Sequence, residues 1–237
     1  MCDSLVIVIP AFNEDQNIAD TIREWYPVVA AHDGDGRSRL LVVDDGSTDN
    51  TGCILREMSR SMPLLMVLRK PNGGHGSAVY AGYRRAIRLG ADYIFQTDAD
   101  GQTDAGDFEA FWNLRSGYDA VIGMRPVRGD GRWRAFIEKV LCLLLWIVFG
   151  VRVPDANAPF RLMKRELLER YIRHIPKSYP IPNVMLTTFF AYYGEHIAFR
   201  PVTFQNRKKG KGSLRPLKIA RIGLRSLQSF LAFRKRM

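Results

Sequence analysis

Short apolar runs alternate with amphipathic stretches along the first 125 residues. The β-branched run at 5–9 is typical of a buried strand, and the apolar residues of 17–31 recur at helical spacing. The same alternation continues with strand 40–43, helix 49–61, strand 64–68, helix 77–89, strand 92–97, helix 107–115 and strand 119–123. Strands of about five residues separated by helices predict an α/β fold, with a mostly parallel, Rossmann-like sheet covered by helices on both faces.

The pattern changes in the second part of the chain. Segment 134–149 predicts a helix, and its stretch 140–149 has no polar residue except Cys142. Such a stretch is too short to span a bilayer, which takes about 20 apolar residues. Two interpretations stay open: a buried core helix, or a helix lying in a membrane interface between flanking arginines. A turn at 155–161, a helix at 183–193 and a strand at 196–204 are predicted next.

Positive charge is concentrated at the C-terminal end. The formal net charge is +11, and twelve Lys and Arg with no Asp or Glu follow from Arg200 onward, so the rest of the chain is near neutral. We expect a domain at 1–205 and an appendage at 206–237, formed by a basic loop and an amphipathic helix from about Pro216. A basic amphipathic helix favours an anionic membrane surface. Nucleic acid is the weaker interpretation, because the basic segment has neither interleaved stacking aromatics nor a recognised binding motif.

The cysteines and the N-terminus bear on the compartment. Cys2, Cys53 and Cys142 lie far apart and in no metal-ligand spacing, which is typical of a reduced cytosolic chain. The chain enters its first strand without a basic region or a cleavage site, so we expect no signal peptide.

Polar segments follow five of the predicted strands. The carboxyl ends of parallel strands meet at one edge of a sheet, where α/β proteins bind ligands. The segments are Pro10-Ala11-Phe12-Asn13-Glu14, Asp44-Asp45-Gly46-Ser47-Thr48-Asp49, Asn72-Gly73-Gly74-His75-Gly76, Asp98-Ala99-Asp100-Gly101-Gln102 and Arg125. Each alone is equally consistent with a turn or a helix cap. Together they predict a site at which a divalent cation between Asp98 and Asp100 holds a phosphate-bearing ligand.

In this order and at these spacings, the segments resemble family 2 glycosyltransferases, in particular the dolichyl-phosphate mannose synthase-like branch. The resemblance covers about residues 5–235. It implies a GT-A fold, a UDP- or GDP-sugar donor, and Mg²⁺ or Mn²⁺ as cofactor. The Gln-x-x-Arg-Trp motif of processive synthases is absent, which favours transfer of one sugar per encounter.

The resemblance also implies roles for individual residues. The residues implied to line the nucleotide pocket are Pro10, Phe12, Glu14, Val43 and Asp45, with Asp45 at the base. Those implied to hold the metal and the donor diphosphate are Asp98, Ala99, Asp100 and Gln102. Arg125 and Arg207 match arginines that face phosphate. A family lysine would fall at Ser213, for which we take Lys211 as a substitute, and His75 stands where the family often has another lysine.

We therefore expect an inverting, metal-dependent glycosyltransferase, peripheral at the cytoplasmic membrane face, with polyprenyl phosphate as the acceptor. A phosphate with a second pKa of about 6 is already an anion and needs no general base. The alternative acceptor is a sugar hydroxyl in cell-surface polysaccharide synthesis, which would need a base. Asp155 is the candidate base, although capping the turn before Phe160 would explain it equally well.

Two further alternatives belong to other classes. A sugar nucleotidyltransferase normally carries a glycine-rich, arginine-containing loop after strand one, which this chain lacks. A non-catalytic adaptor would bind lipid or nucleic acid through its basic C-terminal segment.

Overall fold

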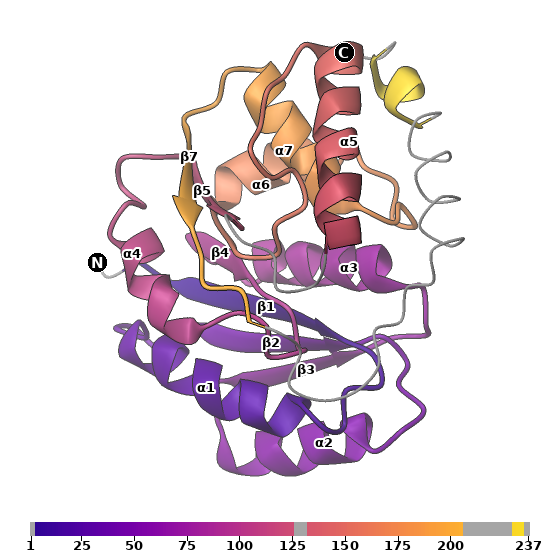
Figure 1. Ribbon diagram of the computed structural model, residues 1–237. Helices are drawn as coiled ribbons and strands as arrows, with labels where there is room; N and C mark the ends of the chain where they lie inside the picture. The colour runs from indigo at the N-terminus through magenta and orange to yellow at the C-terminus, as the bar shows by residue number, and fades with distance from the viewer. Residues whose placement is uncertain (1–2, 126–131, 206–228, 235–237) are drawn as a thin grey trace.

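A seven-stranded sheet with helices on both faces forms the body of the protein. The computed structural model describes residues 3–125, 132–205 and 229–234 (Figure 1). The strands are β1 (Leu5–Ala11), β2 (Arg39–Asp44), β3 (Leu65–Arg69), β4 (Tyr93–Gln96), β5 (Ala120–Met124), β6 (Arg161–Lys164) and β7 (Ile197–Pro201). The helices are α1 (Ile18–Ala31), α2 (Thr51–Ser61), α3 (His75–Arg88), α4 (Phe108–Trp112), α5 (Arg132–Phe149), α6 (Arg165–Ile172) and α7 (Pro182–Tyr192), with the 3-10 turn η1 (Ala105–Asp107) before α4.

The strand order creates a crevice at the centre of the sheet. The order is β3-β2-β1-β4-β6-β5-β7, and every neighbouring pair is parallel except those that β6 makes with β4 and β5. The chain winds outward from β1 to β3 and then crosses back to place β4 on the other side of β1. Ligands of open α/β sheets bind where the winding reverses, outside the carboxyl ends of the strands. Here that point lies between the ends of β1 and β4.

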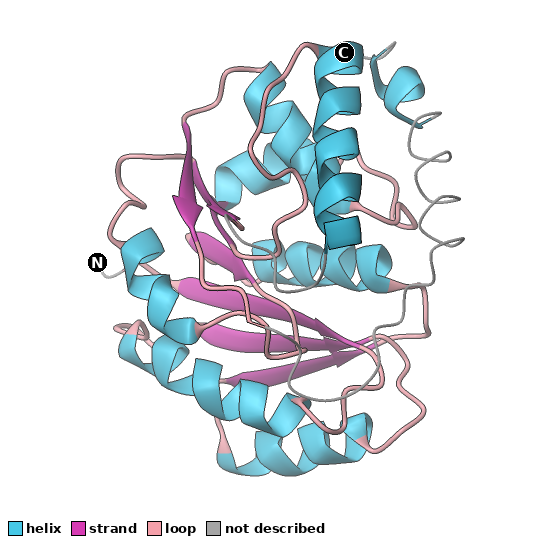
Figure 2. Cartoon of the chain, in the orientation of Figure 1, coloured by secondary structure: helices cyan, strands magenta, loops and turns pink. Residues whose placement is uncertain are grey.

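Two apolar layers enclose the sheet, because alternate residues of each strand face opposite sides. In β1, Val6 and Val8 belong to the core under α3, α5, α6 and α7, whereas Leu5, Ile7 and Ile9 belong to the core under α1, α2 and α4. Figure 2 shows these two helical layers on either side of the strands. The predicted α/β class and mostly parallel sheet are therefore confirmed.

Several element boundaries differ from the sequence prediction. β1 runs on to Ala11, so Pro10 lies inside a strand, in register with Val43 of β2. Proline has no backbone N–H to donate to a neighbouring strand. The ladder tolerates Pro10 because its nitrogen points toward β4, whose pairing with β1 has already ended at Val8 and Gln96. Helix α6 was not predicted, and the expected helix 107–115 is only a 3-10 turn and the five-residue α4. The expected strand 196–204 ends at Pro201.

Helix α5 is buried on one side and exposed on the other. Leu145, Val148 and Phe149 are buried in the core. The opposite side, which we call the apolar face of α5, exposes four large side chains: Val140, Leu143, Trp146 and Ile147. The described C-terminal residues pack nearby, with the ring centroid of Phe230 5.9 Å from that of Phe149.

No helix within the described ranges is long and apolar enough to cross a membrane.

The contact between α3 and the sheet requires a glycine. A Cβ added to Gly82 would lie 2.3 Å from Val8 Cγ1 and 3.1 Å from Val43 Cγ2. We expect Gly82→Ala to lower the free energy of unfolding by about 1–3 kcal/mol, because α3 would have to move off the sheet. Urea denaturation measures the change.

Gly117→Ala is the matched control for that substitution. A Cβ added there meets only ordinary contact, 3.7 Å from Leu114 O, so we expect a change within about 0.5 kcal/mol. Equal effects of the two substitutions would contradict the packing argument.

Candidate active site

Asp98 and Asp100 lie in the turn that follows β4, at the reversal point between β1 and β4. The amide of Thr97 still donates to Val8 O of β1 (3.1 Å), and beyond it the chain turns. Ala99 is buried, and its carbonyl accepts the Thr21 hydroxyl of α1 at 3.0 Å, whereas Asp98 and Asp100 on either side of it are partly exposed. Burial of Ala99 thus anchors the turn and leaves the two carboxylates at the strand-end edge.

Gln102 connects this turn to the segment that leads into the basic loop. Its side-chain nitrogen Nε2 donates to the backbone oxygen of Gln205 (3.0 Å), and the backbone N–H of Gln205 donates to the backbone oxygen of Gln102 (2.8 Å). Thr203 N is held in turn by the Asp107 carboxylate at 2.6 Å. The chain therefore passes the acidic turn immediately before residue 206. Arg207 and Lys211, two of the predicted site residues, lie outside the described residues.

The segment after β1 presents an aromatic ring at the same edge. The Phe12 side chain is 44% exposed, so its ring is accessible at this edge. Asn13 adopts a left-handed conformation (φ 55°), and its side-chain oxygen accepts the amide of Thr48 at 2.9 Å. Glu14 N donates to the Thr51 hydroxyl at 2.9 Å. The loops after β1 and β2 are thus bonded to each other.

Three of the predicted nucleotide-pocket residues are buried. Pro10 and Val43 lie within their strands, and Asp45 is 1% exposed. The Asp45 carboxylate accepts the amides of Gly73 (3.1 Å) and Gly74 (2.8 Å) and is paired with the Lys70 ammonium. Asp45 therefore organises the glycine turn before α3. His75 is exposed at the first residue of that helix.

Gly46 permits the close approach of these loops. Its φ is +72°, and an added Cβ would lie 2.8 Å from Asn72 N. The neighbouring Asp44 is buried; its Oδ1 accepts Ser47 N (2.9 Å), and its Oδ2 lies 3.5 Å from Arg69 Nε. The acidic segment after β2 is therefore engaged mostly with the protein itself.

Arg125 and Asp155 form a bidentate ion pair that the sequence did not predict. Arg125 Nε donates to Asp155 Oδ2 (2.7 Å) and Nη2 to Oδ1 (2.9 Å), with side chains only 8% and 4% exposed. Glu138 of α5 lies 3.9 Å from Arg125 Nη2 and accepts the amide of Ala156 at 2.8 Å. The guanidinium also stacks over the Phe204 ring, 5.2 Å from its centroid. This cluster joins β5, α5, the loop before β6 and the segment before the basic loop.

The donor atoms of the acidic turn suit a hard divalent cation. Magnesium usually binds through one or two carboxylates, completed by waters and substrate phosphates. Asp98 and Asp100 provide two such carboxylates, and Gln102, two residues further on, carries an amide oxygen. Among residues 3–125, 132–205 and 229–234, no three His, Cys, Asp or Glu side chains cluster as a complete metal cage. The residues fit a cation that is shared with a diphosphate.

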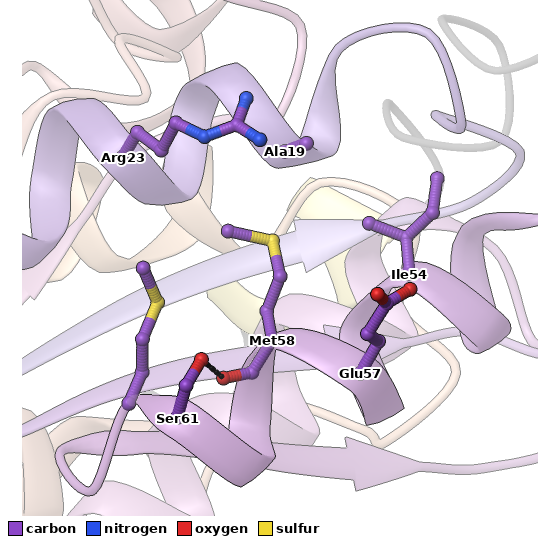
Figure 3. Close-up of a pocket in the computed structure, with 7 residues that line it drawn as sticks. Ala19, Arg23, Ile54, Glu57, Met58 and Ser61 are labelled. Atoms are coloured by element: carbon purple, nitrogen blue, oxygen red, sulfur yellow. Dashed lines mark hydrogen bonds between the residues drawn. The ribbon is translucent and has the colours of Figure 1, made fainter.

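A groove on another part of the surface contains none of these residues. It lies between α1 and α2, has a volume of about 410 Å³, and is lined by Ala19, Arg23, Ile54, Glu57, Met58, Ser61 and Met62 (Figure 3). Its lining mixes polar and apolar side chains and brings together no carboxylate pair or glycine turn. We do not assign it to the site.

The fold and its acidic edge are those of an α/β enzyme of the GT-A class. The sequence model of Glycosyl transferase family 2 matches residues 6–172. This chain therefore belongs to glycosyl transferase family 2, as the motifs predicted. Membership of the family argues against the nucleotidyltransferase and adaptor alternatives.

The relatives are mostly transferases named for polyprenyl phosphates. The undecaprenyl-phosphate mannosyltransferase of Micrococcus luteus is 28% identical over 218 residues, covering 89% of this chain and 87% of that protein. The polyprenol monophosphomannose synthase of Mycolicibacterium smegmatis is 27% identical, covering 86% and 78%. The undecaprenyl-phosphate 4-deoxy-4-formamido-L-arabinose transferase of Pseudomonas syringae pv. syringae is 27% identical over 90% of this chain, which spans only 61% of that relative. The resemblance to the dolichyl-phosphate mannose synthase-like branch is confirmed.

Solved structures support the fold. Glucosyl-3-phosphoglycerate synthase from Mycobacterium tuberculosis, in complex with phosphoglyceric acid, matches with a TM-score of 0.68 at 20% identity, covering 97% of this chain and 80% of that one. The same enzyme in complex with Mn²⁺, UDP and glucosyl-3-phosphoglycerate matches with a TM-score of 0.67 at 19% identity, covering 98% and 80%. The GT-A fold is thus confirmed.

Proposed function

We propose that the protein transfers one sugar from a UDP- or GDP-sugar to a polyprenyl phosphate, with inversion, at the cytoplasmic face of a membrane. The observation that carries the proposal is the position of Asp98 and Asp100 at the reversal point of the sheet, at the edge where the exposed Phe12 ring also lies. A carboxylate pair there suits a cation-bound diphosphate, and an exposed aromatic ring suits a nucleotide base. The names of the relatives support the class of acceptor.

Each group at the edge has a distinct task in this proposal. When bound, Mg²⁺ or Mn²⁺ stabilises the charge that develops on the leaving nucleoside diphosphate. Asp98, Asp100 and Gln102 would hold the cation, Phe12 and Glu14 would contact the nucleoside, and Arg207 and Lys211 would close over the donor. The acceptor phosphate attacks the anomeric carbon from the far side as the sugar–diphosphate bond breaks.

The state of Asp155 favours a phosphate acceptor over a sugar hydroxyl. A general base needs an oxygen that can reach the acceptor proton. Both Asp155 oxygens accept hydrogen bonds from Arg125, and Oδ1 also accepts Asn157 N at 3.1 Å. A polyprenyl phosphate is already ionised and needs no such base. We therefore propose that Asp155 holds Arg125 in place.

A donor screen tests the proposal. The purified protein is incubated with Mn²⁺ and a panel of UDP- and GDP-sugars, with and without polyprenyl phosphate. We expect a glycolipid product from one donor class only when the lipid phosphate is present. Transfer to a sugar hydroxyl at an equal rate, or no transfer from any donor, would contradict the proposal.

Membrane binding is proposed to use the apolar face of α5. Large side chains such as Trp146 (44% exposed) and Ile147 (60%) insert favourably between lipid headgroups, and Arg152 lies 5.2 Å from the Trp146 ring. Full burial of one such side chain contributes about 1.5–3 kcal/mol. We expect Trp146→Ser with Ile147→Ser to weaken binding to anionic vesicles at physiological salt by at least about tenfold, as measured by co-sedimentation.

Met58→Gln is the control for that experiment. Met58 is a partly exposed apolar residue of the groove between α1 and α2, and its replacement should leave vesicle binding unchanged. Failure of the wild-type protein to bind anionic vesicles would refute the membrane proposal.

A further inference from the structure

A buried chain of polar side chains ends on Asp98. Gln96, the last residue of β4, donates from Nε2 to Asp98 Oδ1 at 3.2 Å. Its Oε1 accepts from Asn183 Nδ2 of α7 at 2.7 Å, and the Tyr83 hydroxyl of α3 lies within donating distance of both amide oxygens, Asn183 Oδ1 (2.9 Å) and Gln96 Oε1 (3.1 Å). The four groups come from three elements that are distant in sequence and meet beneath the acidic turn.

The chain has one direction of hydrogen-bond donation. The Asp98 carboxylate only accepts when it is ionised, so the nitrogen of the Gln96 amide must face it. The Gln96 oxygen then needs a donor, which is the amide nitrogen of Asn183. The Asn183 oxygen in turn accepts from Tyr83. Rotation of the Gln96 amide by 180° would turn its oxygen toward the Asp98 carboxylate and its nitrogen toward the Asn183 nitrogen. The Tyr83 hydroxyl lies beside both amide oxygens and favours the same orientation of Asn183.

The surroundings keep this chain dry and in place. Gln96 and Tyr83 are 0% exposed and Asn183 is 3% exposed. Burial raises the pKa of the Tyr83 phenol well above its usual value, so the hydroxyl keeps its proton and stays a donor. Arg161, also fully buried, donates to the backbone carbonyl of Asn183 at 3.2 Å and to Ala158 O at 2.7 Å. A low-dielectric environment strengthens such a network when all its members are satisfied.

We propose that Gln96 is a positioning residue for Asp98, and that Asn183 and Tyr83 set the orientation of its amide. The inference rests on the proposed function, in which Asp98 holds the cation and the donor diphosphate. Partners that orient a metal-binding side chain commonly change metal affinity by about 10- to 100-fold when they are removed. The apolar run before Asp98 thus ends on a polar residue because the carboxylate has to point in one direction.

Asn183→Asp tests the orientation directly. The new carboxylate accepts hydrogen bonds only, so it should bind the Gln96 nitrogen and turn the Gln96 oxygen toward Asp98. The nearby Arg161 limits the cost of the added charge. Gln96→Met, which removes the amide and keeps the side-chain length, is the second variant.

The readout is Mn²⁺ binding in the presence of UDP or GDP, followed by the electron paramagnetic resonance signal of free Mn²⁺. We expect both variants to raise the dissociation constant of Mn²⁺ by about 10- to 100-fold. The Mn²⁺ concentration that gives half the maximal transfer rate should rise by the same factor, with a smaller change in the rate at saturating Mn²⁺. A general loss of stability would lower the rate at saturating Mn²⁺ as well, so it would not mainly raise the half-maximal Mn²⁺ concentration.

Thr188→Val is the matched control. Thr188 is a buried hydroxyl of the same helix, α7, bonded at 2.7 Å to Val184 O of its own helix and to no member of the network. Its replacement should leave Mn²⁺ affinity within about twofold of wild type. Loss of this one hydrogen bond should lower the free energy of unfolding only slightly. Thermal unfolding of each variant establishes that it is folded.

The outcomes separate this inference from the proposed function. Wild-type protein that binds no Mn²⁺ with either nucleotide overturns the proposed function, and this inference with it. Mn²⁺ binding that is lost in Asp100→Ala but unchanged in folded Asn183→Asp and Gln96→Met overturns this inference alone. If neither variant folds, Tyr83→Phe decides: it frees the Asn183 amide to rotate, and unchanged Mn²⁺ affinity overturns the inference.

Discussion

Replacing Asp100 by alanine is expected to lower the rate of sugar transfer by about 10²- to 10³-fold or more. Asp100 is one of the two carboxylates at the reversal point of the sheet, and its Oδ1 also accepts the amide of Gln102 at 3.2 Å. Without it, a cation would keep only the Asp98 carboxylate, and the charge developing on the leaving diphosphate would be poorly stabilised. The loss corresponds to about 3–4 kcal/mol of transition-state stabilisation.

The measurement is the transfer rate at saturating donor, together with Mn²⁺ affinity. Asp104→Ala is the matched control, because Asp104 is a carboxylate four residues further on that caps η1 through Gly106 N (2.8 Å). The control should lose about 1 kcal/mol of stability and keep its activity. Chelation of divalent cations should reduce the wild-type rate to the level of Asp100→Ala. Full activity of Asp100→Ala would refute the metal site.

The second large effect is expected at the ion pair between Arg125 and Asp155. Arg125→Gln should lower the free energy of unfolding by about 3–5 kcal/mol, because it removes a bidentate, charged partner of the Asp155 carboxylate, which is only 4% exposed. Glu138, 3.9 Å from the same guanidinium, loses a favourable charge as well. Urea denaturation gives the change in stability, and the transfer assay should show loss of activity at the same time.

A double variant separates stability from function at this pair. Arg125→Met combined with Asp155→Leu removes both charges, and apolar residues of similar volume often replace a buried ion pair without loss. We expect most of the stability to return while activity stays low, since the Arg125 guanidinium is no longer available to the donor phosphate. Recovery of activity along with stability would indicate that Arg125 has only a structural role. An active, stable Asp155→Asn single variant would remove Asp155 from consideration as a general base.

Local sequence patterns determined most of the architecture. The period of apolar residues predicted five parallel strands and the helices between them, because burial on both faces of a sheet requires runs of apolar residues. Proximity of the strand-end segments also followed, since parallel strands present their carboxyl ends at one edge. Phe12, Asp98 and Asp100 lie at that edge in the structure. Helix α6 was missed although its buried residues Leu167, Leu168, Tyr171 and Ile172 recur at helical spacing, because the helix has only eight residues.

Which side chains bind one another, by contrast, was visible only in the tertiary structure. Arg125 and Asp155 are thirty residues apart, and nothing local to either indicates that β5 and the loop before β6 bring them together. The resemblance implied a nucleotide contact for Asp45, and only the structure showed that its buried carboxylate binds the amides of Gly73 and Gly74 and the Lys70 ammonium. Only the packing of α5 divided its apolar residues between the core and an exposed face. For Gln96, the nearest indication in the sequence was its own position as a polar residue at the end of an apolar strand.

The physical reason lies in the range of the interactions. Hydrophobic periodicity repeats every two or 3.6 residues, so a few turns of chain are enough to reveal an element and the edge on which it ends. Hydrogen bonds and ion pairs depend on distances of about 3 Å between groups, and those distances are set by strand order and by which faces are buried. The sequence by itself therefore determined the class of fold and the acidic edge of the sheet. Only the tertiary structure decided which side chains hold that edge in position.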